Sequence, residues 1–143
     1  MEKTLLSVVI PTLNAASTLA ATLDSLESQL IGVDHEVIIA DGTSSDISRA
    51  ISKAKGARLI SVARGRGAQL AAGGNAARGD WLLFLHADTM LDESWRMEAA
   101  AFMASADNNR RAGVFRLRFD DRGRAARCLE TIAAWRSRML GLP

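Results

Sequence analysis

The sequence has few of the residues that form the disulfides or zinc sites of small proteins. One cysteine, Cys128, stands among 143 residues, so no disulfide can form within the chain. Two histidines and one cysteine also exclude a zinc site of the usual Cys/His kind. Any metal would therefore have to sit on carboxylate oxygens, which suits magnesium or manganese.

Long apolar runs are absent as well. No run approaches the roughly 18–20 residues that span a bilayer, and the opening residues lack the charged, apolar and small-residue order of a signal peptide. The expected location is therefore the cytoplasm. Apolar residues still make up 48% of the chain, which favours one folded domain with a real core over a disordered chain.

Charge is small in total and uneven along the chain. The net charge is +2, but residues 110–143 carry nine arginines against three acidic residues, whereas residues 1–109 balance to −4. A basic tail of this kind could face nucleic acid, an anionic membrane surface, a subunit contact in a homodimer, or only solvent. Nucleic acid is disfavoured, because the basic segment has no aromatic residue besides Trp135 and no known binding motif.

Short apolar runs alternate with helical patterns. Strands are expected at 8–10, 37–40, 58–62, 81–85 and 114–119, and the last of them is expected to have one solvent-exposed face. Helices are expected at 19–30, 45–55, 69–78, 92–103 and 125–140. The expected helix caps are Asn14 or Ser17, Ser45 or Asp46, and Asp92. This order predicts an α/β fold: a mostly parallel sheet of about five strands with helices on both faces, in a single domain over 1–143.

Polar side chains gather where the predicted strands end. Ligands of open α/β sheets bind at the carboxyl ends of the strands, where the strand order reverses. The segments that follow the strands are 11–14, 41–46, 64–67 and 86–89. The first of them has no glycine, which disfavours a dinucleotide-binding enzyme and a sugar nucleotidyltransferase.

Three of these segments carry a resemblance. Val-Val-Ile-Pro-Thr-Leu-Asn at 8–14, the strand and Gly-Thr-Ser-Ser turn at 37–46, and Gly-Asp-Trp-Leu-Leu-Phe-Leu-His-Ala-Asp at 79–88 resemble, in order and spacing, the motifs of family-2 glycosyltransferases. His86 stands where the family's Asp-x-Asp motif has its first Asp. The His-Ala-Asp-Thr variant, with an Arg-Gly run and a glutamine before it, is similar to a bacterial subgroup of that family.

The resemblance implies a nucleotide-diphospho-sugar transferase of the GT-A fold, with an inverting transfer to an unidentified acceptor hydroxyl. Asp88 would hold a divalent manganese or magnesium ion that bridges the diphosphate of the donor. Asp41 would accept a hydrogen bond from the base. The residues implied to contact the donor in other ways are Pro11, Thr12, Asn14, Arg66 and His86.

Each role has a plainer alternative. Asp88 could cap a turn or helix, Asp41 could be a turn residue before Gly42, and His86 could be a hydrogen-bonded structural histidine. Arg66 could be solvated, and Asp46 is expected to be a helix cap rather than a ligand.

Family members usually continue with an acceptor-side segment that carries the catalytic base, and Asp120-Asp121 is too turn-like for that role. We therefore expect the base beyond Pro143, in a domain truncated at its C-terminal side. The alternatives are a non-catalytic nucleotide-binding module or a protein like the sugar nucleotidyltransferases. The acceptor, if the transferase interpretation holds, could be lipid-linked and presented at the inner face of the membrane.

Overall fold

The computed structural model describes residues 5–116, 118–121 and 123–140. The chain forms two compact units, residues 1–100 and 101–143. The elements are β1 (Leu6–Thr12), α1 (Ala16–Gln29), β2 (His35–Asp41), α2 (Ser48–Ala54), β3 (Arg58–Ser61), α3 (Arg66–Ala76), β4 (Trp81–Phe84), α4 (Trp95–Ala104), a 3-10 turn (Ala106–Asn108) and α5 (Arg124–Leu140). In the part of the chain that the structure describes, no helix is both long and apolar enough to cross a bilayer.

The first unit is built on a parallel sheet of four strands in the order β3-β2-β1-β4. The α/β class and the first four predicted strands are thereby confirmed. The chain steps outward from β1 through β2 to β3 and then returns to the other side of β1 for β4. The strand order therefore reverses between β1 and β4, which is the position where open sheets of this class bind ligands.

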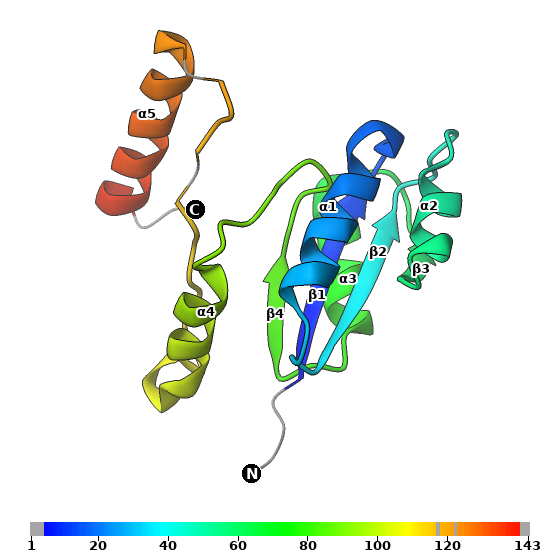
Figure 1. Cartoon of the computed structure of the whole chain (residues 1–143), viewed down its shortest axis with the longest axis horizontal. Coiled ribbons are helices and arrows are strands. Elements are labelled where there is room, and N and C mark those ends of the chain that lie inside the picture. The colour runs from blue at the N-terminus through cyan, green and yellow to red at the C-terminus, as the bar shows by residue number, and fades with distance from the viewer. Residues whose placement is uncertain (1–4, 117, 122, 141–143) are drawn as a thin grey trace. The chain divides into compact units, whose positions relative to one another are not determined.

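The central strand β1 is covered on both faces. Val8, Val9 and Ile10 are fully buried, and alternate residues of a strand point to opposite faces. A β-carbon added at Gly73 of α3 would lie 2.2 Å from Val9 Cγ1, so α3 covers the face of Val9. Figure 1 shows α1 on the near side of the sheet and α3 behind it, which confirms helices on both faces.

The strand predicted at 114–119 is wrong for the residues that the structure describes there, since none of them is in a strand. The sheet accordingly has four strands instead of about five. Alternation of apolar and polar residues is a local property, whereas a strand needs a hydrogen-bonded neighbour. The helix predicted at 125–140 is confirmed as α5.

Of the predicted caps for the first two helices, only Asp46 bonds to a helix start, while Asn14, Ser17 and Ser45 are corrected. Ala15 and Ile47 occupy the capping positions of α1 and α2, and neither helix is capped by Asn14, Ser17 or Ser45. Asp46 instead serves both helix starts: its carboxylate accepts from the backbone N–H of Ala16 and from that of Ser48, each at 2.9 Å. The partner of the α1 start thus lies 30 residues away, where local pattern reasoning does not reach.

Candidate functional site

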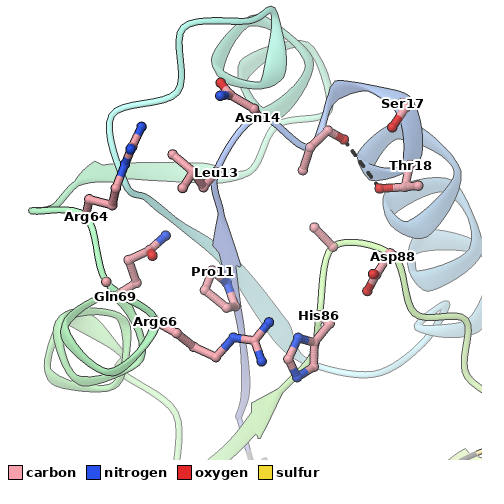
Figure 2. Close-up of a pocket in the computed structure, with 13 residues that line it drawn as sticks. Pro11, Leu13, Asn14, Ser17, Thr18, Arg64, Arg66, Gln69, His86 and Asp88 are labelled. Carbon is pink, nitrogen blue, oxygen red and sulfur yellow. Dashed lines mark hydrogen bonds between the residues drawn. The ribbon is translucent and has the colours of Figure 1, made fainter.

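A pocket of about 450 Å³ opens at the carboxyl ends of β1 and β4, beside the start of α3. It lies where the strand order reverses. Figure 2 shows its side chains converging from the loops after β1, β3 and β4 and from α1. The lining residues are Pro11, Leu13, Asn14, Ala15, Ser17, Thr18, Arg64, Gly65, Arg66, Gln69, His86, Ala87 and Asp88.

Two arginines and a histidine give the pocket its basic side. Arg64 precedes α3 and Arg66 opens it, with Gly65 between them at φ 143°, a backbone conformation that favours glycine. In Figure 2 the Arg66 guanidinium points toward the ring of His86. All three side chains are exposed. A guanidinium has a planar fork of N–H donors that matches phosphate oxygens, so this side suits an anionic ligand.

Asp88 is the one carboxylate among the residues that line the pocket. It is exposed, and Thr89 Oγ1 lies 3.5 Å from its Oδ1. Within the described residues no group of three or more His, Cys, Asp or Glu side chains could hold a metal ion. Magnesium is commonly held by one or two carboxylates together with substrate phosphates. The donor set therefore fits a divalent ion that takes its other ligands from a bound phosphate compound and from water.

Asp41 and Thr12 are buried and do not line the pocket. Asp41 is fully buried, and its carboxylate accepts four hydrogen bonds: from Ser44 Oγ (2.5 Å), Ser44 N (3.0 Å), Thr12 Oγ1 (3.0 Å) and Arg49 Nη1 (3.4 Å). Burial by itself raises the pKa of Asp41. The hydrogen bonds from Ser44 and Thr12, with the charge of Arg49, outweigh burial and hold the pKa below its usual value.

Asn14 ties the loop after β1 to the loop after β2. The Oδ1 of Asn14 accepts hydrogen bonds from Ser45 N (2.9 Å) and Ser45 Oγ (3.2 Å). The backbone N–H of Asn14 donates to Ser44 Oγ (2.9 Å). Its φ of 52° is left-handed, which asparagine tolerates better than most residues. Ser44 contacts both Asn14 and Asp41, so the pocket wall and the buried carboxylate share one hydrogen-bonded network.

Gln69 is a site residue to which the sequence argument gave no role. Its side chain is buried, and Nε2 donates to Thr12 O (2.7 Å) and Ala40 O (2.8 Å) at the ends of β1 and β2. It therefore joins α3 to both strand ends while also lining the pocket. The sequence shows only a glutamine near the start of an Ala- and Gly-rich helix, and neither its burial nor its bonds to the two strands can be read from that pattern.

The structure thus brings five of the predicted donor and metal residues to one pocket: Pro11, Asn14, Arg66, His86 and Asp88. Thr12 and Asp41 are buried and are not part of that lining. Residues that line it without having been selected from the sequence include Leu13, Ser17, Thr18, Arg64 and Gln69. Arg64 lies in one of the segments that follow the predicted strands, but the sequence analysis did not select it as a candidate donor contact.

Comparisons with protein-family models and with known proteins both find glycosyltransferases. The family model described as "Glycosyl transferase family 2" matches residues 7–141. A PGL/p-HBAD biosynthesis glycosyltransferase of Mycobacterium bovis (strain BCG / Pasteur 1173P2) is 39% identical over 101 residues, which cover 66% of this chain and 39% of that protein. Glucosyl-3-phosphoglycerate synthase of Mycobacterium tuberculosis is 32% identical over 92 residues, 58% of this chain and 28% of that protein. The chain therefore spans about two fifths or less of the length of these relatives.

Solved structures show the same fold. The crystal structure of Mycobacterium tuberculosis glucosyl-3-phosphoglycerate synthase in complex with Mn²⁺, UDP and glucosyl-3-phosphoglycerate has a TM-score of 0.61 and 26% identity, covering 70% of this chain and 39% of that one. Mannosyl-3-phosphoglycerate synthase from Rubrobacter xylanophilus matches with a TM-score of 0.57 and 23% identity, covering 62% of this chain and 32% of that one. At that identity the second match supports the fold alone.

Proposed function

Because the chain belongs to glycosyl transferase family 2, we propose that its pocket binds a nucleotide-diphosphate sugar and that the protein transfers the sugar to an acceptor hydroxyl. One observation carries the proposal. The pocket sits at the reversal of strand order and sets the carboxylate of Asp88 in the same lining as the guanidiniums of Arg64 and Arg66. A diphosphate needs cationic partners, and its leaving-group charge grows as the sugar bond breaks.

Asp88 is the proposed metal ligand, with manganese or magnesium as the ion. The ion would neutralise charge that develops on the diphosphate. Asp88 suits the role because its carboxylate is exposed in the pocket and is not saturated by the described residues. The relative solved with UDP carries Mn²⁺ in its crystals, which supports a divalent ion here. His86, two residues before Asp88, would contact a phosphate oxygen or orient the Asp88 carboxylate.

Arg66 and Arg64 are the proposed diphosphate contacts. Both extend from the turn that opens α3, and both line the pocket. The backbone N–H groups at the start of a helix add a partial positive charge on the same side. The arginines would therefore hold the diphosphate from the side of the pocket opposite Asp88, which Figure 2 shows on the other side of His86 from Arg66.

The end of β1 and the loop that follows it form the proposed nucleoside wall, through Pro11 and Asn14. Thr12 and Asp41 would serve the base although neither lines the pocket. Asp41 already accepts four hydrogen bonds, so it could accept from a base N–H only if Ser44 turned its hydroxyl away. In this proposal Asp41 acts on the base either through that exchange or by fixing the Ser44 turn.

The acceptor side of the reaction is proposed from the family alone. An inverting transfer needs a general base within hydrogen-bond reach of the acceptor hydroxyl. Of the residues that line the pocket, only Asp88 and His86 have a carboxylate or an imidazole, and Asp88 is assigned to the metal. A non-catalytic nucleotide-binding module is therefore the second candidate. The proposed setting is the cytoplasm, at the inner face of the membrane if the acceptor is lipid-linked.

The test is the thermal stability of the chain with UDP, GDP, CDP and dTDP, each with and without Mn²⁺. A ligand at a hundredfold excess over its Kd stabilises the folded state by about 2.7 kcal/mol. We expect a manganese-dependent rise in Tm with one nucleotide. A folded chain that responds to none of the four would contradict donor binding.

Sugar transfer is tested separately. Release of nucleotide from the matching nucleotide sugar, with and without added acceptor, distinguishes the two candidates. Acceptor-dependent release supports the transferase. Tight binding with no release at any acceptor supports the binding module instead.

A further inference from the structure

The side-chain amide of Gln69, near the start of α3, is held in place by its nitrogen. Nε2 donates to Thr12 O at 2.7 Å and to Ala40 O at 2.8 Å. A side-chain amide nitrogen has two N–H groups, so both of them are used. Both partners are carbonyl oxygens, which only accept, so the nitrogen is the atom that faces them. The orientation of the amide is thereby fixed, and Oε1 is left as an acceptor.

This Oε1 has no donor among the residues that the structure describes. Gln69 is only 4% exposed, yet it lines the pocket. No buried side-chain oxygen or nitrogen of the described residues lacks a hydrogen-bond partner, so an Oε1 without one must be open to the pocket. A carbonyl oxygen held rigidly at the edge of a cavity is an acceptor for an N–H or O–H group of a ligand.

The ligand group at Oε1 cannot be a phosphate, because phosphate oxygens also accept. Gln69 lies three residues after Arg66 on α3, so the two side chains are neighbours on one side of the helix. A ligand whose phosphates meet Arg66 therefore brings a neighbouring group to Gln69. Figure 2 shows the Gln69 amide on the other side of Pro11 from Asp88, so this group lies away from the proposed metal ligand.

The surroundings of the amide suit a nucleobase better than a sugar. Thr12, whose carbonyl accepts from Gln69 Nε2, lies in the chain between Pro11 and Leu13, and both of these line the pocket. Apolar side chains suit the faces of a flat ring, whereas a sugar carries polar hydroxyls on most of its carbons. Proteins read a base by hydrogen bonds to its edge. Uracil, thymine and guanine have a ring N–H on that edge, where cytosine and adenine have a ring nitrogen that only accepts.

We propose that Gln69 is a specificity-determining residue whose Oε1 accepts a hydrogen bond from the ring N–H of the base, which selects uracil, thymine or guanine over cytosine and adenine. The inference rests on the proposed function, in which the pocket binds a nucleotide-diphosphate sugar. A base without the ring N–H would leave Oε1 unpaired, and sites built around a hydrogen bond reject ligands that cannot make it. The Asp41 carboxylate, by contrast, already accepts four hydrogen bonds.

Methylated nucleotides test the contact on the unchanged chain. Calorimetry with Mn²⁺ first identifies which of UDP, GDP, CDP and dTDP binds, and we expect one with a ring N–H. The matching N-methyl analogue, 3-methyl-UDP, 3-methyl-dTDP or 1-methyl-GDP, should bind at least about tenfold more weakly, because Oε1 loses its partner. The controls keep the ring N–H and carry one extra carbon elsewhere on the base: 5-methyl-UDP, 5-ethyl-2′-deoxy-UDP or N2-methyl-GDP. They should bind more tightly than the N-methyl analogue.

Gln69→Met tests the residue itself. Methionine has a similar helix propensity and only a weak acceptor, so the variant should bind the responding nucleotide about tenfold more weakly. It should also no longer distinguish that nucleotide from its N-methyl analogue. Asn75→Met, at an exposed position of the same helix, is the matched control and should keep both the affinity and the discrimination. If thermal unfolding shows that Gln69→Met does not fold, the methylated nucleotides on the parent chain decide alone.

The failures of this inference and of the proposed function are distinguishable. Equal binding of the responding nucleotide and its N-methyl analogue overturns the role of Gln69 and leaves donor binding intact. Preferential binding of CDP overturns it too, as does an N-methyl penalty that persists in a folded Gln69→Met. A folded chain that binds none of the four nucleotides contradicts the proposed function itself.

Discussion

Asp41 is a buried carboxylate that keeps its charge because four donors surround it. Its pKa is raised by burial and lowered more strongly by Ser44, Thr12 and Arg49, with a net fall. A carboxyl whose pKa is lower in the folded state than in the unfolded one stabilises the fold at every pH above the unfolded value of about 3.9. That contribution disappears as the pH falls through the folded pKa.

Asp41→Asn should therefore destabilise the chain at neutral pH. An amide nitrogen would face groups that donate, which leaves donors such as Ser44 N without an acceptor, and we expect a loss of about 1–3 kcal/mol in the free energy of unfolding. Urea unfolding at pH 7 and at a series of values below pH 4 measures it. The difference in unfolding free energy between the parent chain and Asp41→Asn should become smaller as the pH falls below 4. A gap that is constant across that range would contradict a charged Asp41.

Asp88 is the opposite case: it is an exposed carboxylate, and the role proposed for it is to bind a metal ion, not to stabilise the fold. Asp88→Asn should leave the unfolding free energy of the free chain nearly unchanged. It should weaken the manganese-dependent binding of the responding nucleotide by at least about tenfold, as measured by calorimetry. Glu93→Gln, an exposed acidic residue five positions later, is the control and should bind like the parent. Unchanged binding by Asp88→Asn would remove that residue from the site.

The rule that ligands bind at strand ends predicted the positions of most pocket residues. It did not predict which groups those residues contact. Pro11, Asn14, Arg66, His86 and Asp88 could be placed at one site because each follows a predicted strand or opens the next helix. Their contacts with a ligand stay predictions. The bond between Thr12 and Asp41 and the two bonds of Gln69 join groups 29 to 57 residues apart, and no local pattern encodes such a partner.

At the scale of elements, α3 meets the sheet through a glycine. A β-carbon at Gly73 would lie 2.2 Å from Val9 Cγ1, closer than such atoms approach, whereas one at Gly74 would be in ordinary contact at 3.6 Å from Phe84. Both glycines lie inside the same helix, and alanine has the higher helix propensity at either. At Gly73 an alanine would gain helix propensity but clash with Val9. At Gly74 it would gain helix propensity without a clash.

Gly73→Ala and Gly74→Ala should consequently differ in sign. We expect Gly73→Ala to lose about 1–3 kcal/mol through overpacking against β1 and Gly74→Ala to gain about 0.5–1 kcal/mol. Urea unfolding of the two variants beside the parent chain decides it. If both variants were stabilised, α3 could not be as close to β1 as the structure places it.

The elements with strong local patterns were predictable, and those that depend on a distant neighbour were not. Buried strands such as 37–40 and the amphipathic helix 125–140 have patterns that few other structures could use. The run 114–119 has the pattern of a strand but no strand partner among the described residues. The start of α1 depends on Asp46, which belongs to the loop between β2 and α2.

At the scale of the molecule, the core and the pocket belong to the first unit. The buried apolar residues lie between Leu6 and Trp95, with Ala126 as the exception among the described residues. All the residues that line the pocket lie between Pro11 and Asp88. The second unit carries nine arginines, and Ala126 is the one buried apolar residue among those of its side chains that the structure describes.

A chain cut after Ala104, the last residue of α4, should therefore keep a cooperative thermal transition within a few degrees of the parent. It should also keep any manganese-dependent nucleotide shift that the parent shows, because the hydrophobic core supplies most of the stability. Thermal unfolding of both chains with and without ligand measures this. A shortened chain that lacks a cooperative transition would show that the first unit needs residues beyond Ala104.

The contact between Gly42 and Gln69 has a consequence for how this site can change over evolutionary time. A β-carbon at position 42 would stand 3.0 Å from the amide of Gln69, the group that ties β1 and β2 to α3. A side chain at position 42 would require the Gln69 amide to move by a few tenths of an ångström, and two hydrogen bonds to the carbonyls of Thr12 and Ala40 hold that amide in place. A lineage that acquires a side chain at 42 therefore gains from a change at position 69. Positions 42 and 69 should therefore covary among homologues, as one inherited unit.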